Sequence, residues 1–217
     1  MTRFKGILFD VDGVLVDSEP FIAEAGVRMF AELYGATVAV GDFAPFIGTG
    51  EARFLGGVAE THGIAIDIAK AKKRAYGIYY EVIKGRLLPV PGAIELVRVL
   101  RAAGIRTAIA TSADKVKLDA NLLEVGLKEE DFDAVVTGLD VERKKPFPDI
   151  YIEAAHRLGL DPADCLVIED APEGLRAGKA AGATCLGIST TFSGQVLVEA
   201  GASRVLANLL GGIAALV

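Results

Sequence analysis

The chain has 217 residues, of which 52% are hydrophobic and 24% are charged, and its formal net charge is −6. This composition is typical of a folded globular protein with a sizeable core, and it excludes a disordered chain. The acidic balance argues against general nucleic-acid binding. The sequence contains two histidines and two cysteines. So few of these residues argue against a histidine-based triad and against a Cys/His zinc site.

The cysteines and the chain ends indicate the compartment. Cys165 and Cys185 each lie in or beside an apolar run, so we expect two buried reduced thiols rather than a disulfide. Reduced thiols fit a cytoplasmic location. The first apolar run is short and ends at Asp10, so no secretory signal is predicted. The apolar stretch 206–217 is too short to span a bilayer, and we expect it to be a packed terminal element.

Short apolar runs alternate with helical patterns, as in βαβ units built around a parallel sheet. The sequence therefore predicts an α/β fold whose core is a doubly wound (Rossmann-like) parallel sheet. The expected strands cover 6–10, 106–111, 134–136, 165–169 and 184–188, and the expected core helices cover 113–125, 149–158 and 172–181.

The segment from about 17 to 88 breaks this alternation. It contains no convincing strand, and apolar residues recur at helical spacing over 21–34, 50–62 and 67–84. We therefore predict a helical cap domain, residues 17–87, inserted after the first strand of an α/β core formed by 1–16 and 88–217. Because both connections are short, they could act as hinges that let the cap close over the strand ends.

Asp10 and Asp12 come directly after the first predicted strand. Ligands bind at the carboxyl ends of strands in parallel α/β sheets. Residues two apart on a strand point the same way, and Gly13 permits a sharp turn after them. Carboxylates this close need a cation or a shared proton, so the pair predicts a metal site. The alternative, a calcium loop of the EF-hand type, lacks its third acid and its distal glutamate.

Three further strand ends carry polar groups, namely Thr111-Ser112, Lys145, and Glu169-Asp170. Each has an ordinary structural explanation: a helix N-cap, a surface lysine and a strand-end cap, respectively. Taken together they provide oxygen ligands for Mg²⁺ and a hydroxyl and an ammonium group that can hold phosphate. Spare carboxylates remain to act as nucleophile and as acid and base.

The same residues resemble the motifs of the haloacid dehalogenase-like (HAD) phosphohydrolases. That family has D-x-D-G near the N-terminus, then a Ser/Thr, a Lys and an acidic pair. In this chain the motifs are Asp10-Val11-Asp12-Gly13, Thr111, Lys145 and Glu169-Asp170. The position of the cap and the sequence Lys145-Pro146-Phe147-Pro148-Asp149 are similar to the β-phosphoglucomutase-like subgroup. The resemblance covers the whole chain.

This resemblance implies a Mg²⁺-dependent phosphatase acting on a small phosphorylated metabolite, such as a sugar phosphate. Asp10 would form an aspartyl-phosphate, and Asp12 would act as acid and then as base. Thr111, Ser112 and Lys145 would hold the phosphoryl group. The implied metal site consists of Asp10, the Asp12 backbone carbonyl, Asp170 and, directly or indirectly, Glu169.

Residues of the cap indicate how the substrate is recognised, and they argue against one alternative function, that of a mutase. The related mutases hold a second phosphate with an arginine where this chain has Glu51. A carboxylate ~5 Å from a phosphate charge costs roughly 3 kcal/mol per unit charge, which argues against a hexose-phosphate mutase. Thr49 has an alternative role as the N-cap of the next helix. The cap residues expected to contact substrate are Phe46, Thr49, Glu51, Arg53 and Lys84.

The segment 42–59 also resembles the HAD domain of plant "suppressor of quenching" proteins. This likeness raises a second alternative, a non-catalytic regulatory module. It would place the domain in the plastid stroma if the chain comes from such a multidomain protein. The complete set of acids, hydroxyl and lysine favours an enzyme, because a domain that only binds does not need both Asp10 and Asp12.

Overall fold

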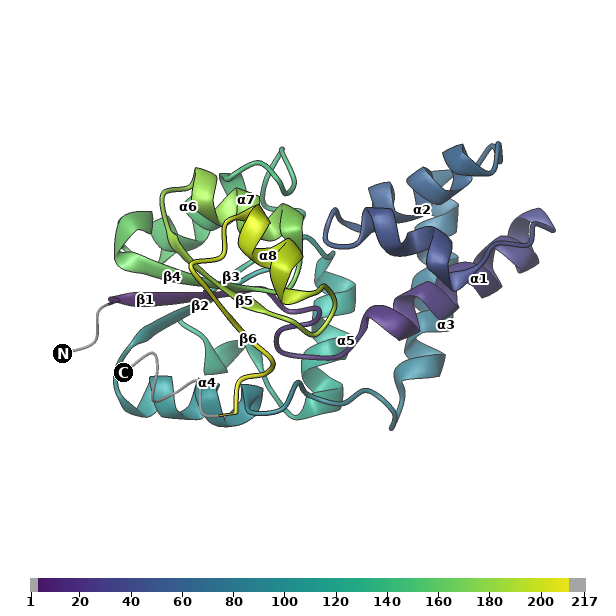
Figure 1. The fold of residues 1–217 in the computed structure, drawn as a ribbon. Coiled ribbons are helices and arrows are strands. Elements are labelled where there is room, and N and C mark those ends of the chain that lie inside the picture. Colours follow the sequence, from purple (N-terminus) through teal and green to yellow (C-terminus); the bar gives the residue numbers. More distant parts are fainter. Residues whose placement is uncertain (1–3, 211–217) are drawn as a thin grey trace.

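Six parallel strands form one sheet in the computed structural model, which describes residues 4–210. The strands lie in the order β3-β2-β1-β4-β5-β6 (Figure 1). In this doubly wound order the direction of winding reverses between β1 and β4, and ligands bind at such a switch point. The predicted fold class is confirmed. The strands are β1 (Gly6–Phe9), β2 (Arg106–Ala110), β3 (Ala134–Val136), β4 (Cys165–Glu169), β5 (Thr184–Ile188) and β6 (Arg204–Leu206).

Helices cover both faces of the sheet, which explains why its strands are continuously apolar. Side chains of β1 alternate between the faces: Ile7 and Phe9 pack into one hydrophobic cluster and Leu8 into the other. In Figure 1, α4 (Ala93–Ala102) and α5 (Lys115–Val125) lie on one face of the sheet, and α6 (Asp149–Arg157), α7 (Pro172–Ala180) and α8 (Gly194–Ala200) lie on the other. The short 3-10 turns η2 (Glu129–Asp131) and η3 (Pro162–Asp164) precede β3 and β4.

A helical layer lies beside the carboxyl ends of the strands (Figure 1). It consists of α1 (Glu19–Tyr34), the 3-10 turn η1 (Val40–Phe46), α2 (Glu51–Thr61) and α3 (Ile68–Ile83). Phe43 stacks on Phe54 with ring centroids 4.7 Å apart and approaches Phe30 at 6.3 Å. The helical layer therefore buries aromatic side chains of its own.

The two segments that join the helical layer to the sheet run side by side. Val16 forms an antiparallel bridge with Pro89, and the amide of Val90 donates to the carbonyl of Leu15 at 3.1 Å. Movement of the helical layer would therefore bend both segments together. The exact limits of the cap, 17–87, stay a prediction.

Some boundaries and elements differ from the expectation. β1 and β2 end one residue early, although the amides of Asp10 and Thr111 still donate to the neighbouring strands. Helices α4 and α8 and strand β6 were not predicted. β6 has only three residues and begins with a charged one, so it carries no clear period. Within the expected terminal element 206–217, Leu209 is buried and residues 211–217 lie outside the described part.

Two further sequence-based expectations concern the cysteines and the membrane. Cys165 and Cys185 are both buried and free, as expected. Between residues 4 and 210, no helix combines the length and the apolar character needed to cross a membrane.

The close contact between α1 and η1 depends on Gly26. A Cβ atom at this position would lie 2.6 Å from the Phe43 ring. We expect Gly26→Ala to destabilise the protein by about 1–3 kcal/mol through overpacking. The matched variant Gly77→Ala, in α3, meets only the Arg74 guanidinium at 3.5 Å and should stabilise by about 0.5–1 kcal/mol. Urea denaturation measures both changes, and a shift of the same sign in both variants would contradict this packing argument.

Asp140 anchors the loop that leads from β3 to Lys145. Its carboxylate accepts hydrogen bonds from the Thr137 amide and hydroxyl and from Arg157. Partial burial raises its pKa, but these bonds outweigh the burial and lower the pKa to about 2. The stabilisation is therefore present above the unfolded pKa near 4 and disappears as the pH falls towards 2. We expect Asp140→Asn to cost about 1 kcal/mol at pH 7 and much less at pH 2.5. Denaturation at the two pH values tests this, and an equal cost at both would rule it out.

Candidate functional site

The turn after β1 places two carboxylates at the switch point of the sheet. The Asp10 amide still donates to the Ile168 carbonyl at 3.0 Å, and a tight turn follows in which the Gly13 amide donates to the Val16 carbonyl. Gly13 has a φ of +73°, and a Cβ atom there would overlap the Asp170 carboxylate. Glycine is thus required both by the turn and by the approach of Asp170.

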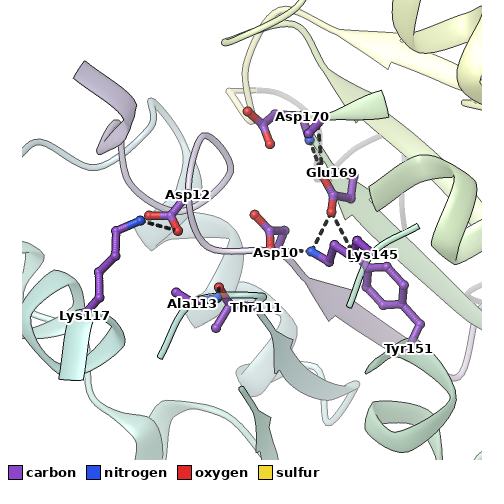
Figure 2. Close-up of polar contacts among 10 residues, drawn as sticks. Asp10, Asp12, Thr111, Ala113, Lys117, Lys145, Tyr151, Glu169 and Asp170 are labelled. Carbon is purple, nitrogen blue, oxygen red and sulfur yellow. Dashed lines mark hydrogen bonds and ion pairs between the residues drawn. The ribbon is translucent and has the colours of Figure 1, made fainter. Parts of the chain in front are cut away.

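A buried lysine joins two carboxylates next to this turn. The Lys145 ammonium lies 2.6 Å from Asp10 Oδ1 and 2.7 Å from Glu169 Oε1 (Figure 2). Burial alone would lower the pKa of Lys145, but the two carboxylates raise it above its usual value. Burial raises the pKa of Asp10 to about 7 in spite of Lys145. The lysine is therefore charged, and it is shared between two acids.

Glu169 has every oxygen position engaged by the protein. Its Oε1 also accepts from the Tyr151 hydroxyl at 2.8 Å, and its Oε2 accepts from the amides of Asp170 and Ala171, both at 3.0 Å. Helix α7 packs so closely that a Cβ atom at Gly174 would overlap the carboxylate. Glu169 is thus held rigidly and positions Lys145.

Asp170, unlike Glu169, has a carboxylate oxygen without a hydrogen-bond partner among residues 4–210. This oxygen, Oδ2, is buried. Burial, Glu169 and Asp10 together raise its pKa well above the usual range. Oxygen atoms of Asp10, Glu169 and Asp170 all lie within 4.8 Å of one another. This cluster therefore has negative charge and acceptor capacity to spare, the condition for holding a cation.

The end of β2 contributes two hydroxyl groups. Thr111 Oγ1 accepts from the Ala113 amide at 3.1 Å, which leaves its proton free to donate. Ser112 Oγ is buried with no partner in the described part of the chain. Both residues line the same cavity as Asp10 and Asp170.

Asp12 lies on the other side of Asp10, against α5 (Figure 2). Its Oδ2 is 2.8 Å from the Lys117 ammonium, and its Oδ1 accepts from Ser18 and from Asn121 Nδ2, the latter at 3.1 Å. The Tyr79 hydroxyl donates to Asn121 and orients its amide. Burial raises the pKa of Asp12, but Lys117 and the hydrogen bonds outweigh it and lower the pKa below the usual value.

Sequence reasoning missed Lys117, Asn121, Ser18 and Tyr151. Lys117 and Asn121 lie one helical turn apart on the buried face of α5, so polar residues among the apolar positions of that helix were a usable signal. Tyr151 lies on the apolar face of α6, where its pattern cannot be told from that of a core residue.

A cavity of about 30 Å³ lies between the strand ends and the helical layer. This volume holds about two water molecules. Lys145, which binds Asp10, and Glu169, which binds Lys145, do not line the cavity. The lining residues from the sheet side are Asp10, Asp12, Thr111, Ser112, Ala113, Lys117 and Asp170, and those from the helical layer are Glu19, Ile22, Phe46, Ile47, Gly48, Gly50, Glu51 and Phe54.

Some of the cap residues that were expected to contact substrate line the cavity, and others do not. Phe46 and Glu51 line the cavity. Arg53 is exposed, pairs with Glu60 at 2.6 Å and lies over the Phe46 ring. Successive helical positions are about 100° apart, so burying Glu51 turns Arg53 towards solvent.

Thr49 and Lys84 also lie outside the lining. Thr49 does not cap α2, whose N-cap is Gly50; its hydroxyl donates to the Phe46 carbonyl at 2.6 Å. Lys84 is exposed at the end of α3.

The chain is similar to several known proteins along most of its length. It is 43% identical over 206 residues to the chloroplastic protein SUPPRESSOR OF QUENCHING 1 of Arabidopsis thaliana, covering 94% of this chain but 19% of that protein. It is 36% identical over 192 residues to hexitol phosphatase A of Escherichia coli, covering 86% and 84% of the two chains. The crystal structure of CbbY from Rhodobacter sphaeroides in complex with phosphate has a TM-score of 0.89 at 29% identity, covering 98% and 99%.

The family profile of haloacid dehalogenase-like hydrolases matches residues 4–182. This match spans strands β1 to β4, the helical layer and the site residues described above. The identification made from the motifs is confirmed: the chain belongs to the haloacid dehalogenase-like hydrolase family.

Proposed function

We propose that the chain is a Mg²⁺-dependent phosphatase that hydrolyses small organic phosphate monoesters, such as sugar phosphates, through an aspartyl-phosphate on Asp10. The observation that supports this most directly is the convergence of Asp10, Asp12 and Asp170 on one cavity, with Lys145 against Asp10. Relatives that are named phosphatases, among them hexitol phosphatase A, support the same class of reaction.

The acidic cluster fits a magnesium ion. Asp170 Oδ2 lacks a partner, whereas the oxygens of Glu169 are already occupied by four donors. We therefore assign the ion to Asp10, Asp170 and the backbone carbonyl of Asp12, with Glu169 in a supporting position. Mg²⁺ binds through one or two carboxylates plus water and substrate phosphate. When bound, it would neutralise negative charge on the transferring phosphoryl group.

In the first step an Asp10 oxygen attacks phosphorus and the bond from phosphorus to the leaving oxygen breaks. Asp12, carrying the proton that it takes from water in the second step of the preceding cycle, donates it to that oxygen and is left ionised. The hydroxyl groups of Thr111 and Ser112, which line the cavity, would donate to the transferred oxygens. Lys145 lies behind Asp10, outside the lining, and would use its remaining N–H to hold the phosphoryl group once it is bound to Asp10. Two of the three ammonium hydrogens of Lys145 are directed to Asp10 and Glu169.

In the second step Asp12 removes a proton from water, and the water oxygen attacks phosphorus. The bond between phosphorus and Asp10 breaks, which releases inorganic phosphate and regenerates the carboxylate. Lys117 and Asn121 favour the ionised form of Asp12, which is the form that accepts this proton. Since the cavity admits about two waters, the cap opens for substrate and then excludes bulk solvent.

The proposal is tested by Asp10→Asn. We expect this variant to lose Mg²⁺-dependent phosphate release from a panel of monoesters by at least about 10³-fold, because an amide cannot act as the nucleophile. The matched control is Asp119→Asn, an exposed aspartate on α5, which should retain activity. Phosphate release by Asp10→Asn at the wild-type rate would refute the assignment.

Asp170→Asn tests the metal site separately. Replacing an ionised oxygen ligand by an amide should raise the Mg²⁺ concentration for half-maximal activity by about 10- to 100-fold. Activity of the wild type should disappear on chelation and return with Mg²⁺. An unchanged Mg²⁺ requirement in the variant would exclude Asp170 as a ligand.

A further inference from the structure

The cavity carries more negative charge than the proposed reaction needs. Five of its lining residues are carboxylates and one is an ammonium, Lys117. In the proposed mechanism Asp10 and Asp170 serve the metal and the phosphoryl group, and Asp12 serves proton transfer. Two carboxylates, Glu19 and Glu51, have no role in these steps.

Glu51 is the better placed of the two to meet the leaving group. Both residues belong to the helical layer and line the cavity, but Glu51 is buried whereas Glu19 is half-buried. Only 6% of Glu51 is exposed. Its Oε1 lies 3.5 Å from the Lys117 ammonium. Its Oε2 and the nearby Tyr76 hydroxyl are both buried without a hydrogen bond of good geometry in the described chain. Tyr76 is thus a nearby protein donor that competes for an acceptor position otherwise open to a ligand.

The groups around Glu51 leave its charge incompletely balanced. Lys117 is shared with Asp12, which it approaches more closely, at 2.8 Å. Glu19, Asp114, Lys144 and the buried Tyr76 hydroxyl are further titratable groups near Glu51. Burial raises the pKa of Glu51, and Lys117 only partly opposes it. Phe46, Ile47 and Phe54 supply the apolar part of the same wall. No arginine, histidine or second lysine lines the cavity within residues 4–210.

We propose that Glu51 selects substrates by their leaving group: it accepts hydrogen bonds from hydroxyl or ammonium groups and rejects leaving groups that carry a second anion. This inference rests on the proposed phosphatase function and specifies its substrate class, namely monoesters of neutral polyols, sugars or amino alcohols. An anionic group brought to this wall meets a buried carboxylate at low effective dielectric. A polar donor satisfies the unused oxygen, and discrimination by such pairing is strong.

Two sets of phosphate esters that differ in one functional group test the proposal. The three-carbon set is glycerol 3-phosphate, 3-aminopropyl phosphate, n-propyl phosphate and 3-phosphoglycerate. The six-carbon set is glucose 6-phosphate, glucosamine 6-phosphate and 6-phosphogluconate. We expect kcat/KM to be higher for the hydroxyl and amino esters than for the carboxylate ester by on the order of 30-fold or more. n-Propyl phosphate should fall between them.

Glu51→Gln should reduce this preference about tenfold, because it removes the charge and keeps the shape. The matched control is Glu60→Gln, an exposed glutamate on the same helix, which should keep the wild-type ratios. A merely structural role of Glu51 would lower kcat/KM for all esters alike and leave the ratios unchanged.

The outcomes separate the two proposals. If the wild type has equal kcat/KM values for the esters with and without a carboxylate group, the specificity proposal is wrong and the phosphatase proposal stands. The same holds if Glu51→Gln leaves the kcat/KM ratios unchanged. If no ester in either set releases phosphate with Mg²⁺, the proposed function is wrong and the specificity proposal falls with it.

Discussion

Several carboxylates are buried together at the ends of neighbouring strands, and the need to balance their charge organises the whole site. Two buried lysines provide most of the balance, and each is shared by two acids. Lys145 joins Asp10 and Glu169, and Lys117 joins Asp12 and Glu51. Removing one member of such a pair leaves an uncompensated buried charge, which is far costlier than never burying the pair. Among residues 4–210 no lysine, arginine or histidine forms an ion pair with Asp170, whose Oδ2 has no hydrogen-bond partner there. This is the physical basis for proposing a divalent ion beside it.

The two lysines also make Asp10 and Asp12 chemically different. Asp10 shares its lysine with the rigid Glu169, and burial raises its pKa to about 7. Asp12 receives hydrogen bonds from Ser18 and Asn121 in addition to Lys117, and its pKa is lowered. Environments that push the pKa values of neighbouring acids apart suit them to different roles. In the proposed reaction the roles follow from position: Asp10 would receive the phosphoryl group beside Asp170, and Asp12 would move protons beside Lys117 and Asn121.

The helical layer adds a further carboxylate to the group of buried charges. Glu51 reaches Lys117 from the layer, so the approach of the layer to the sheet brings another carboxylate to the ammonium that holds Asp12. The connections at Val16 and Pro89 run side by side, which would let the layer move as one unit. Recognition of the leaving group and exclusion of water would then occur in the same movement, because both depend on the wall that contains Glu51.

Local pattern in the chain was enough to indicate the sheet, the helical insertion and the positions of Asp10, Thr111, Lys145 and Asp170. Buried parallel strands appear as unbroken apolar runs, and polar residues directly after such runs stand out. Strand β6 was missed because its three residues begin with Arg204 and so form no apolar run like that of β3. Helix α8 was missed because its seven residues cover only about two turns.

Tertiary structure alone decided which side of each helix meets the site. It turned Lys117 and Asn121 of α5 inwards, and it buried Glu51 while directing Arg53 to solvent. It also decided which carboxylates share a lysine and how small the cavity is between the strand ends and the helical layer. The physical reason is that periodicity and turn chemistry act over a few residues, whereas helix rotation, charge pairing and cavity size are set by packing between segments far apart in the chain.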